Sequence, residues 1–309
     1  MTAERRRTSY RVLDQTNPLI PYALLLPHAI FFVAFIIYPL LRGFVISLQR
    51  WDPLRDDVPF VGLAHYARLL DPASAQFQKF WSSLGNTLFF VAVTTPLLVA
   101  LALLLAFLLH RKIRGRGFMR SAFFLPTILS VSVVSILFRW MFADRIGLVP
   151  AMLADLGISM PSVLTTRWLA WIPIVLATVW WQVGTNMMLY LAGLAGISES
   201  YNEAAAVDGA NTWQRVRHIT LPLLMPTTLF VSVTTILNQF QMFGQSDLIT
   251  DGGPAESTTT TIMYITTEAF LNNQLSSATA MSFVFGLVML IVTAVQFRAM
   301  TRDISKPGA

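Results

Sequence analysis

Residues Gly85–Leu109 read GNTLFFVAVTTPLLVALALLLAFLL, a run without a single charged side chain. A helix rises about 1.5 Å per residue, so a run of this length is long enough to cross the roughly 30 Å hydrocarbon core of a bilayer. A helix of a soluble protein is usually shorter, and one at the protein surface carries polar residues on one face. The run therefore predicts a transmembrane helix.

The rest of the chain repeats this pattern. The protein is 309 residues long, 55% hydrophobic and 12% charged, about half the charge of a typical soluble chain. Only helices and closed barrels satisfy their backbones in lipid, and the runs lack the alternation of a barrel strand. We predict an all-α integral membrane protein with six transmembrane helices, between tails of residues 1–18 and 299–309. The membrane domain, 19–298, has predicted spans at 19–41, 85–109, 121–138, 168–195, 222–245 and 277–297, none with Asp, Glu, Lys or Arg.

The basic residues between the runs predict the orientation. Alternate connections and the two tails together hold 14 Lys and Arg residues, whereas the opposite connections hold 7. Cytoplasmic segments carry the excess of positive charge, so both termini are predicted to be cytoplasmic. The net charge of +6 then reports orientation and does not indicate nucleic-acid binding. The cytoplasmic set is Arg5, Arg6, Arg7, Arg11, Arg111, Lys112, Arg114, Arg116, Arg120, Arg215, Arg217, Arg298, Arg302 and Lys306.

The sequence lacks the usual signatures of catalysis. It has no cysteine, no G-x-x-x-x-G-K-[ST] phosphate loop, no H-E-x-x-H and no G-x-S-x-G. Its four histidines are scattered and have no partners at metal-ligand spacing, so we predict no catalytic and no metal-binding residue. His28 is the one ionisable side chain within a predicted span, which makes a proton-driven transporter a weak hypothesis.

The fourth connection, residues 197–221, predicts two short helices with a break. Ser200 with Glu203 is a capping-box pattern, and the alanines that follow favour a helix. Gly209 fits the end of that helix, and Asn211 with Gln214 repeats the capping pattern for a second helix. The connection should therefore form a stiff elbow on the cytoplasmic surface.

The same connection carries the pattern E-A-A-x-x-x-G, nine residues, then I-x-L-P, from Glu203 to Pro222. This resembles the signature loop of binding-protein-dependent ABC importer permeases, with their type I importer fold. The resemblance implies a coupling helix that docks on a separate ATPase subunit, although Glu203 and Gly209 would also serve simply to cap and end a helix. The implied docking residues are Glu203, Ala204, Ala205, Asp208, Gly209, Ala210 and Trp213.

Other segments resemble the carbohydrate-uptake branch of this family. Residues 60–66 are followed by Asn86-Thr87, similar to the family's F-V-G-L-x-N-Y and N-T patterns, with His65 in place of the usual Asn. Thr250-Asp251-Gly252-Gly253-Pro254 resembles the T-x-G-G-P loop of the maltose-type first permease subunit. Glycine and proline together predict a sharp turn, which suits either a loop that meets a binding protein or an ordinary connection.

Uncharged polar residues gather in two predicted spans. In span five, Thr234, Asn238, Gln241 and Gln245 follow helical spacing and predict one polar stripe, with Gln239 and Met242 beside it. Amides near aromatic rings suit a sugar, but polar residues also join membrane helices to one another. For the polar residues of span four the sequence favours neither role. The resemblance implies that Asn238, Gln239, Gln241 and Met242 line a sugar site. The candidate pathway residues are Thr234, Asn238, Gln239, Gln241 and Met242, with Gln182 and Asn186 from span four.

Together these observations predict one permease subunit of an ABC importer for a neutral sugar or oligosaccharide. The resemblance implies a second homologous permease, two ABC ATPase subunits, an extracytoplasmic solute-binding protein and a bacterial or archaeal cytoplasmic membrane. ATP and Mg²⁺ would belong to the ATPases, and this chain would bind no cofactor. The alternatives are a permease for another polar solute such as glycerol 3-phosphate, an ion-coupled secondary transporter, and a membrane-embedded enzyme.

Overall fold

The computed structural model describes residues 19–51, 58–111, 113–144 and 146–304. Within these ranges the chain is helical, with one isolated β-bridge between Gln49 and Phe60 and no strand. The predicted all-α class is confirmed for this part of the chain. Several basic residues used for the orientation lie outside the described residues, namely Arg5, Arg6, Arg7, Arg11, Arg55, Lys112, Arg145 and Lys306.

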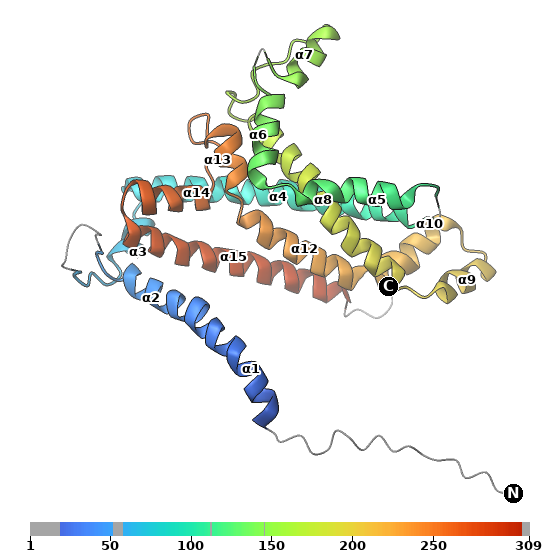
Figure 1. Cartoon of the computed structure of the whole chain (residues 1–309), viewed down its shortest axis with the longest axis horizontal. Coiled ribbons are helices and arrows are strands. Elements are labelled where there is room, and N and C mark those ends of the chain that lie inside the picture. The colour runs from blue at the N-terminus through green and yellow to red at the C-terminus, as the bar shows by residue number, and fades with distance from the viewer. Residues whose placement is uncertain (1–18, 52–57, 112, 145, 305–309) are drawn as a thin grey trace, which may run out of the picture.

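Four long helices, running side by side, form the body of the molecule (Figure 1). They are α4 (Ala75–His110), α8 (Trp171–Ala195), α12 (Met225–Phe240) and α15 (Leu275–Ile304). Shorter helices connect the long ones. They are α3 (Ala64–Leu70), α5 (Arg116–Phe124), η2 (Leu125–Ile128), α6 (Val131–Met141), α7 (Leu148–Asp155), α9 (Glu199–Val207), α10 (Thr212–Arg215), η3 (Val216–Thr220), α11 (Leu221–Leu223), α13 (Gly244–Thr250), α14 (Thr261–Thr266) and η4 (Thr267–Leu271). Among them, α6 and α7 project sideways from the bundle (Figure 1).

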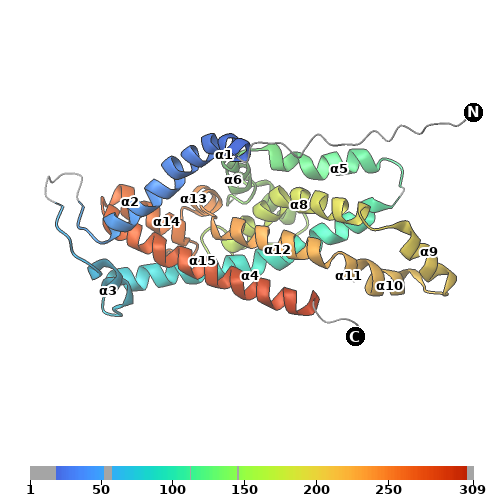
Figure 2. The ribbon, with the colours of Figure 1, turned by 90° about the horizontal axis from the view of Figure 1, so that it is seen from below.

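One helical arm leaves the body. Helices α1 (Leu19–Phe32), η1 (Val33–Ile37) and α2 (Tyr38–Ser47) are continuous, so the helix predicted over 19–41 extends to Ser47. Only α2 packs on the bundle, where Phe44 meets Phe283 of α15 edge to face at 5.5 Å. The side chains described in α1 are all exposed, and Figures 1 and 2 show α1 standing apart from α15.

Four helices in the described residues are long and apolar enough to cross a membrane, and two bent helix pairs would raise the number to six. The four are Leu24–Ser47, Ala75–His110, Trp171–Ala195 and Leu275–Thr301. Helix α4 begins ten residues before the predicted span, and α15 continues through the predicted start of the C-terminal tail. The absence of charged residues marks the apolar part of a helix, but the helix itself can continue beyond that part into water.

The predicted single helix over 121–138 is wrong. The chain forms α5 and η2, extends at Leu129 and Ser130, and then turns by 97° into α6. Ser130 caps the new helix by accepting a hydrogen bond from the Val133 backbone N–H at 3.4 Å. Hydrophobicity alone cannot reveal such a turn, because both sides of it are equally apolar.

The predicted helix over 222–245 is also wrong at both ends. A 62° bend at Leu224 separates α11 from α12, which begins at Met225 with Pro226 in its first turn. Helix α12 ends at Phe240, so Gln245 belongs to the separate helix α13. The polar stripe predicted from Thr234 to Gln245 is therefore continuous only as far as Gln241.

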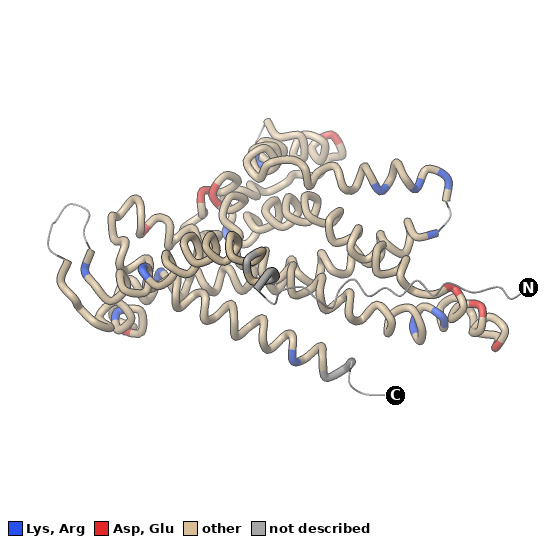
Figure 3. The backbone as a smooth tube through the Cα atoms, turned by 60° about the horizontal axis from the view of Figure 1, so that its bottom comes forward, with Lys and Arg blue, Asp and Glu red and all other residues tan. Residues whose placement is uncertain are grey.

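The long helices hold their charge near their ends. Figure 3 shows them almost free of Lys, Arg, Asp and Glu between the ends, and further charges lie on the shorter helices that project from the bundle. Between the ends, buried aliphatic residues of α4 and α8 pack together, including Leu98, Ala102, Met187 and Leu191. The charge-free length matches the apolar slab of a bilayer.

Helices α5 and α8 approach each other at Gly184. A Cβ added to Gly184 would lie 2.9 Å from the Phe124 Cα and closer still to the Phe123 carbonyl group. Both neighbours are backbone atoms, which cannot rotate away. Small residues allow this kind of close helix approach in membranes.

Gly184→Val is therefore expected to lower the free energy of unfolding by about 3 kcal/mol or more. The matched control is Gly286→Val, also within a helix, because a Cβ at Gly286 would meet nothing within 4 Å. Thermal unfolding of both purified variants in detergent measures the difference. Equal melting temperatures would contradict the close contact between α5 and α8.

Candidate functional site

The loop between α8 and α12, called here the helical loop (residues 197–221), forms the elbow that the sequence predicts. Helix α9 leads away from the bundle, and α10 with η3 returns to it (Figure 1). Gly209 joins the two with φ +81°, a conformation that glycine adopts without strain. The Ala210 N–H donates to the Ala205 carbonyl at 2.9 Å and the Gly209 N–H to the Ala206 carbonyl at 3.1 Å, which is a Schellman ending.

The second half of the elbow is fixed by the predicted capping box. The Asn211 N–H donates to Gln214 Oε1 at 2.8 Å, and the Gln214 N–H donates to Asn211 Oδ1 at 2.9 Å. The other predicted capping box, Ser200 with Glu203, is wrong, because α9 begins at Glu199 and the Ser200 hydroxyl pairs with Ser198 at 2.8 Å. Local hydrogen bonds therefore hold the turn between the two helices.

Several apolar side chains stand exposed on the helical loop. The most exposed are Tyr201, Val207 and Trp213, at 55%, 89% and 66%, in a segment outside the apolar spans. Apolar side chains exposed on a polar segment favour a contact with another protein. Sequence reasoning identified only Trp213, although a tyrosine and a valine in an alanine-rich polar loop could have drawn attention. Among the other predicted docking residues, Glu203, Ala204, Asp208 and Gly209 are exposed, and Ala205 and Ala210 are half-buried.

The polar residues of α12 divide into two groups. The first group faces away from the chain's own interior. Asn238 and Gln241 are exposed, and among the described residues their side-chain amides have no hydrogen-bond partner. Thr234, one turn before Asn238, is partly exposed and donates its hydroxyl to the Phe230 carbonyl at 2.9 Å.

The second group joins α12 to α8. Gln239 is 1% exposed, and its Nε2 donates to Gln182 Oε1 at 2.7 Å. Asn186 Nδ2 donates to Thr235 Oγ1 at 2.9 Å. These bonds give Gln182, Asn186 and Gln239 a role in joining helices. Thr235 was missed by the sequence reasoning, although it lies four residues before Gln239 and so on the same helical face.

Met242, a predicted pathway residue, and Gln245, the end of the predicted polar stripe, lie beyond α12. Met242 is 3% exposed and Gln245 is 4% exposed. Met242 belongs to a buried apolar cluster with Phe90 and Trp171. The exposed polar face therefore consists of Thr234, Asn238 and Gln241, and the burial of Met242 separates it from the other candidates.

The turn with Gly252-Gly253-Pro254 is bound to α4. Asn86 Nδ2 donates to the carbonyl oxygens of Glu256 and Thr259, both at 3.0 Å. Beside it, Thr87 accepts a hydrogen bond from the Thr261 N–H at 2.9 Å. The sequence pair Asn86-Thr87 thus joins α4 to Glu256, Thr259 and Thr261, which lie at least 170 residues further along the chain.

Asn86→Ala is expected to speed amide hydrogen exchange in residues 251–260 by roughly thirtyfold, because two hydrogen bonds of about 1 kcal/mol each are lost. Exchange measured by mass spectrometry checks this. Asn272→Ala is the control, since Asn272 bonds Glu268 outside that segment at 3.0 Å. Unchanged exchange in 251–260 would show that the loop is held by other contacts.

His65 is buried in the connection between α2 and α4. It is 3% exposed in α3, and its Nε2 lies 3.1 Å from the Gln49 carbonyl oxygen. Burial lowers the pKa of His65, the bond to Gln49 opposes this, and the charges of Arg68 and Arg50 lower the pKa further. At neutral pH the ring is therefore uncharged, with Nε2–H as the donor to Gln49. The histidine makes a structural contact in place of the asparagine that the resemblance led us to expect.

Comparisons with known proteins agree with this architecture. A family model described as "Binding-protein-dependent transport system inner membrane component" matches residues 72–302. The arabinooligosaccharides transport system permease protein AraP of Bacillus subtilis is 31% identical, over 95% of this chain and 92% of its own length. The sn-glycerol-3-phosphate transport system permease protein UgpA of Agrobacterium fabrum is 34% identical over 91% and 94%. The lactose transport system permease protein LacF of Rhizobium radiobacter is 35% identical over 86% and 88%.

A solved structure shares the fold. It is titled as a bacterial ABC transporter involved in the import of the acidic polysaccharide alginate. One of its chains superposes with a TM-score of 0.79 at 23% identity, over 93% of this chain and 96% of that chain. A second structure, of the alginate transporter with an alginate pentasaccharide-bound periplasmic protein, superposes with the same TM-score at 24% identity. At this level of identity the likeness establishes the fold.

Proposed function

Because the chain belongs to the family of binding-protein-dependent transport system inner membrane components, we propose that it forms half of an ABC importer's translocation pathway. The solute is a neutral sugar or oligosaccharide delivered by an extracytoplasmic binding protein. Relatives named for arabinooligosaccharide and lactose transport support this solute class. The chain is a non-catalytic subunit, and ATP and Mg²⁺ belong to its partner ATPases.

The observation that carries the solute assignment is the exposed polar face of α12. Exposed amides facing hydrocarbon would each cost several kcal/mol, because lipid offers no hydrogen-bond partner. Asn238 and Gln241 therefore face water, a solute or a second protein. Uncharged amides suit the hydroxyl groups of a sugar, and the predicted spans contain no charged residue that would hold an ionic solute.

Three surfaces of the chain suit the partner subunits. The elbow at Gly209, with Trp213 exposed beside it, suits docking on one of two ABC ATPases. A second, homologous permease would cover the exposed polar face of α12, since a pathway between two subunits needs the matching half. The segment 251–260 suits contact with the binding protein on the opposite end of the bundle.

We propose six spans, with each bent pair counted as one, and both termini in the cytoplasm of a bacterium or archaeon. The 14 to 7 distribution of basic residues supports this orientation. The domain limits remain 1–18, 19–298 and 299–309, with the helical loop, 197–221, as the coupling segment. ATP-driven closure of the ATPases would move this loop and, through α11 and the 62° bend, reorient α12.

A second candidate solute is glycerol 3-phosphate, favoured by the 34% identity to UgpA. Uptake by the reconstituted importer, with its binding protein and ATPases, distinguishes the two. Labelled oligosaccharide should accumulate only with ATP, and glycerol 3-phosphate should not compete. Accumulation of glycerol 3-phosphate would replace the sugar assignment, and uptake by this chain alone on an ion gradient would overturn the importer assignment.

A further inference from the structure

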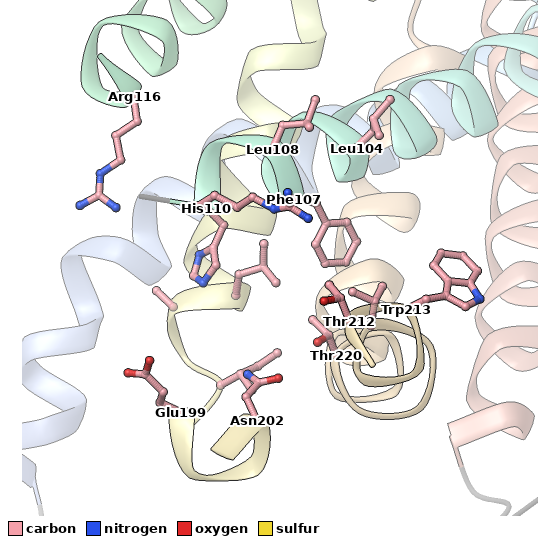
Figure 4. A pocket seen from close by; sticks show the side chains of 15 residues that line it. Leu104, Phe107, Leu108, His110, Arg116, Glu199, Asn202, Thr212, Trp213 and Thr220 are labelled. Atoms are coloured by element: carbon pink, nitrogen blue, oxygen red, sulfur yellow. The ribbon is translucent and has the colours of Figure 1, made fainter. Parts of the chain in front are cut away.

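A cavity lies between the helical loop and the adjoining end of the bundle (Figure 4). Its volume is about 820 Å³, within the range of about 300–1,000 Å³ that is usual for ligand sites. The end of α4 forms one wall, the start of α9 another, and α10 with η3 a third. The polar face of α12 contributes nothing to it, so this cavity is separate from the proposed solute pathway.

The wall formed by α4 changes from apolar to basic along the helix. Leu104 and Leu108 line the cavity and are 54% and 50% exposed. His110 and Arg111 follow directly, and Arg116, at the start of α5, adds a second guanidinium group. Leu104 lies about 10 Å along the helix axis from Arg111, which is about the distance from headgroup level into the acyl region.

The basic groups are not neutralised within the described chain. Glu199 is the one carboxylate that lines the cavity, and no ion pair among the described residues joins it to Arg111 or Arg116. The cavity therefore offers two guanidinium groups and an imidazole against one carboxylate. It favours an anionic occupant.

We propose that this cavity binds an anionic phospholipid, with its headgroup at the basic rim formed by His110, Arg111 and Arg116 and an acyl chain along Leu104 and Leu108. A soluble anion such as free phosphate would satisfy the arginines but leave the leucines uncovered. An acidic side chain of a docked protein would likewise not extend 10 Å into the acyl region. Only an amphipathic anion covers both walls, and basic pockets between helices at the cytoplasmic face bind such headgroups.

The proposal depends on the membrane orientation and the helical loop, not on the transported solute. Because the cavity is also lined by Asn202, Thr212 and Trp213 of the loop, the bound lipid would contact the elbow itself. Anionic lipid would then hold the elbow in place against α4.

The test counts phosphatidylglycerol bound to the intact importer by native mass spectrometry, during titration of complex purified in neutral detergent. Each arginine beside an anionic headgroup contributes on the order of fivefold in affinity, so R111Q/R116Q should bind roughly thirtyfold more weakly. The control is R114Q/R298Q, which removes two exposed arginines of the same predicted side that do not line the cavity. Inorganic phosphate should not displace the lipid, and phosphatidylcholine should not replace it.

Equal phosphatidylglycerol binding by the two double variants would overturn the proposal. Displacement of the lipid by millimolar inorganic phosphate would overturn it in favour of a free anion site. Loss of the ATPases from R111Q/R116Q, with lipid binding unchanged, would assign the arginines to a protein contact instead. Uptake of oligosaccharide by the same samples reports separately on the proposed function, so failure of one can be told from failure of the other.

Discussion

Gly209→Val is expected to reduce solute-stimulated ATP hydrolysis by the assembled importer at least tenfold, while the chain still inserts and remains folded. The reason is the backbone and not the available space, because a Cβ at Gly209 would meet nothing within 4 Å. At φ +81° a β-branched residue is strongly disfavoured, at a cost of about 1–2 kcal/mol or more. The turn would open, and α9 and α10 would no longer present one surface.

Gly209→Asn is the matched control, because asparagine tolerates the left-handed conformation. It should retain most of the ATPase stimulation, although its side chain is much larger than that of glycine. The measurements are ATPase activity in proteoliposomes and co-purification of the ATPase with the permease. If Gly209→Val retains full stimulation, the elbow is not the coupling element. If both variants fail equally, side-chain bulk at the docking surface is the cause.

Asn238→Leu and Gln241→Leu together are expected to lower kcat/KM for oligosaccharide uptake by about tenfold to a hundredfold. The double variant loses two hydrogen bonds of about 0.5–1.5 kcal/mol each and places two branched apolar side chains in the pathway. Leucine distinguishes a face that contacts the solute from a face that contacts lipid. On a face covered by lipid, the change would be neutral or stabilising, because it removes a polar group from hydrocarbon. Uptake kinetics and thermal stability, measured on the same preparation, separate the two cases.

Gln239→Leu is the control on the neighbouring face of α12. It breaks the 2.7 Å bond to Gln182, so it should lower the thermal stability before it changes the specificity for the solute. Unchanged uptake by the Asn238 and Gln241 variant would remove these residues from the pathway. A parallel loss of stability and uptake in all variants would assign the whole polar region to packing.

Much of the fold could be predicted from the distribution of charge. The apolar runs located every long helix, because hydrocarbon excludes charge whatever the local geometry. The turns at Ser130 and Leu224 do not follow from hydrophobicity, because the sequence is apolar on both sides of each. Prolines such as Pro226 favour a break in a helix, but they do not give its angle. The start of α4 at Ala75 could not be predicted either, because a helix that continues into water shows no change of composition where it begins.

The candidate site was predictable where the chemistry is local. Gly209 and the pair Asn211–Gln214 behave as the sequence predicts, because a turn and a capping box involve residues only a few positions apart. The division of the polar residues on α12 was not predictable. It depends on where α8 packs. It also depends on the end of α12 at Phe240, which divides the predicted stripe from Thr234 to Gln245.

Helix α1 has a different meaning in a bilayer from the one it would have in water. Its described side chains are exposed, so it adds almost nothing to the stability of a solitary chain. In a bilayer those apolar side chains lie against acyl chains, which are as apolar as they are. The lipid, more than a protein core, would then hold this arm in place.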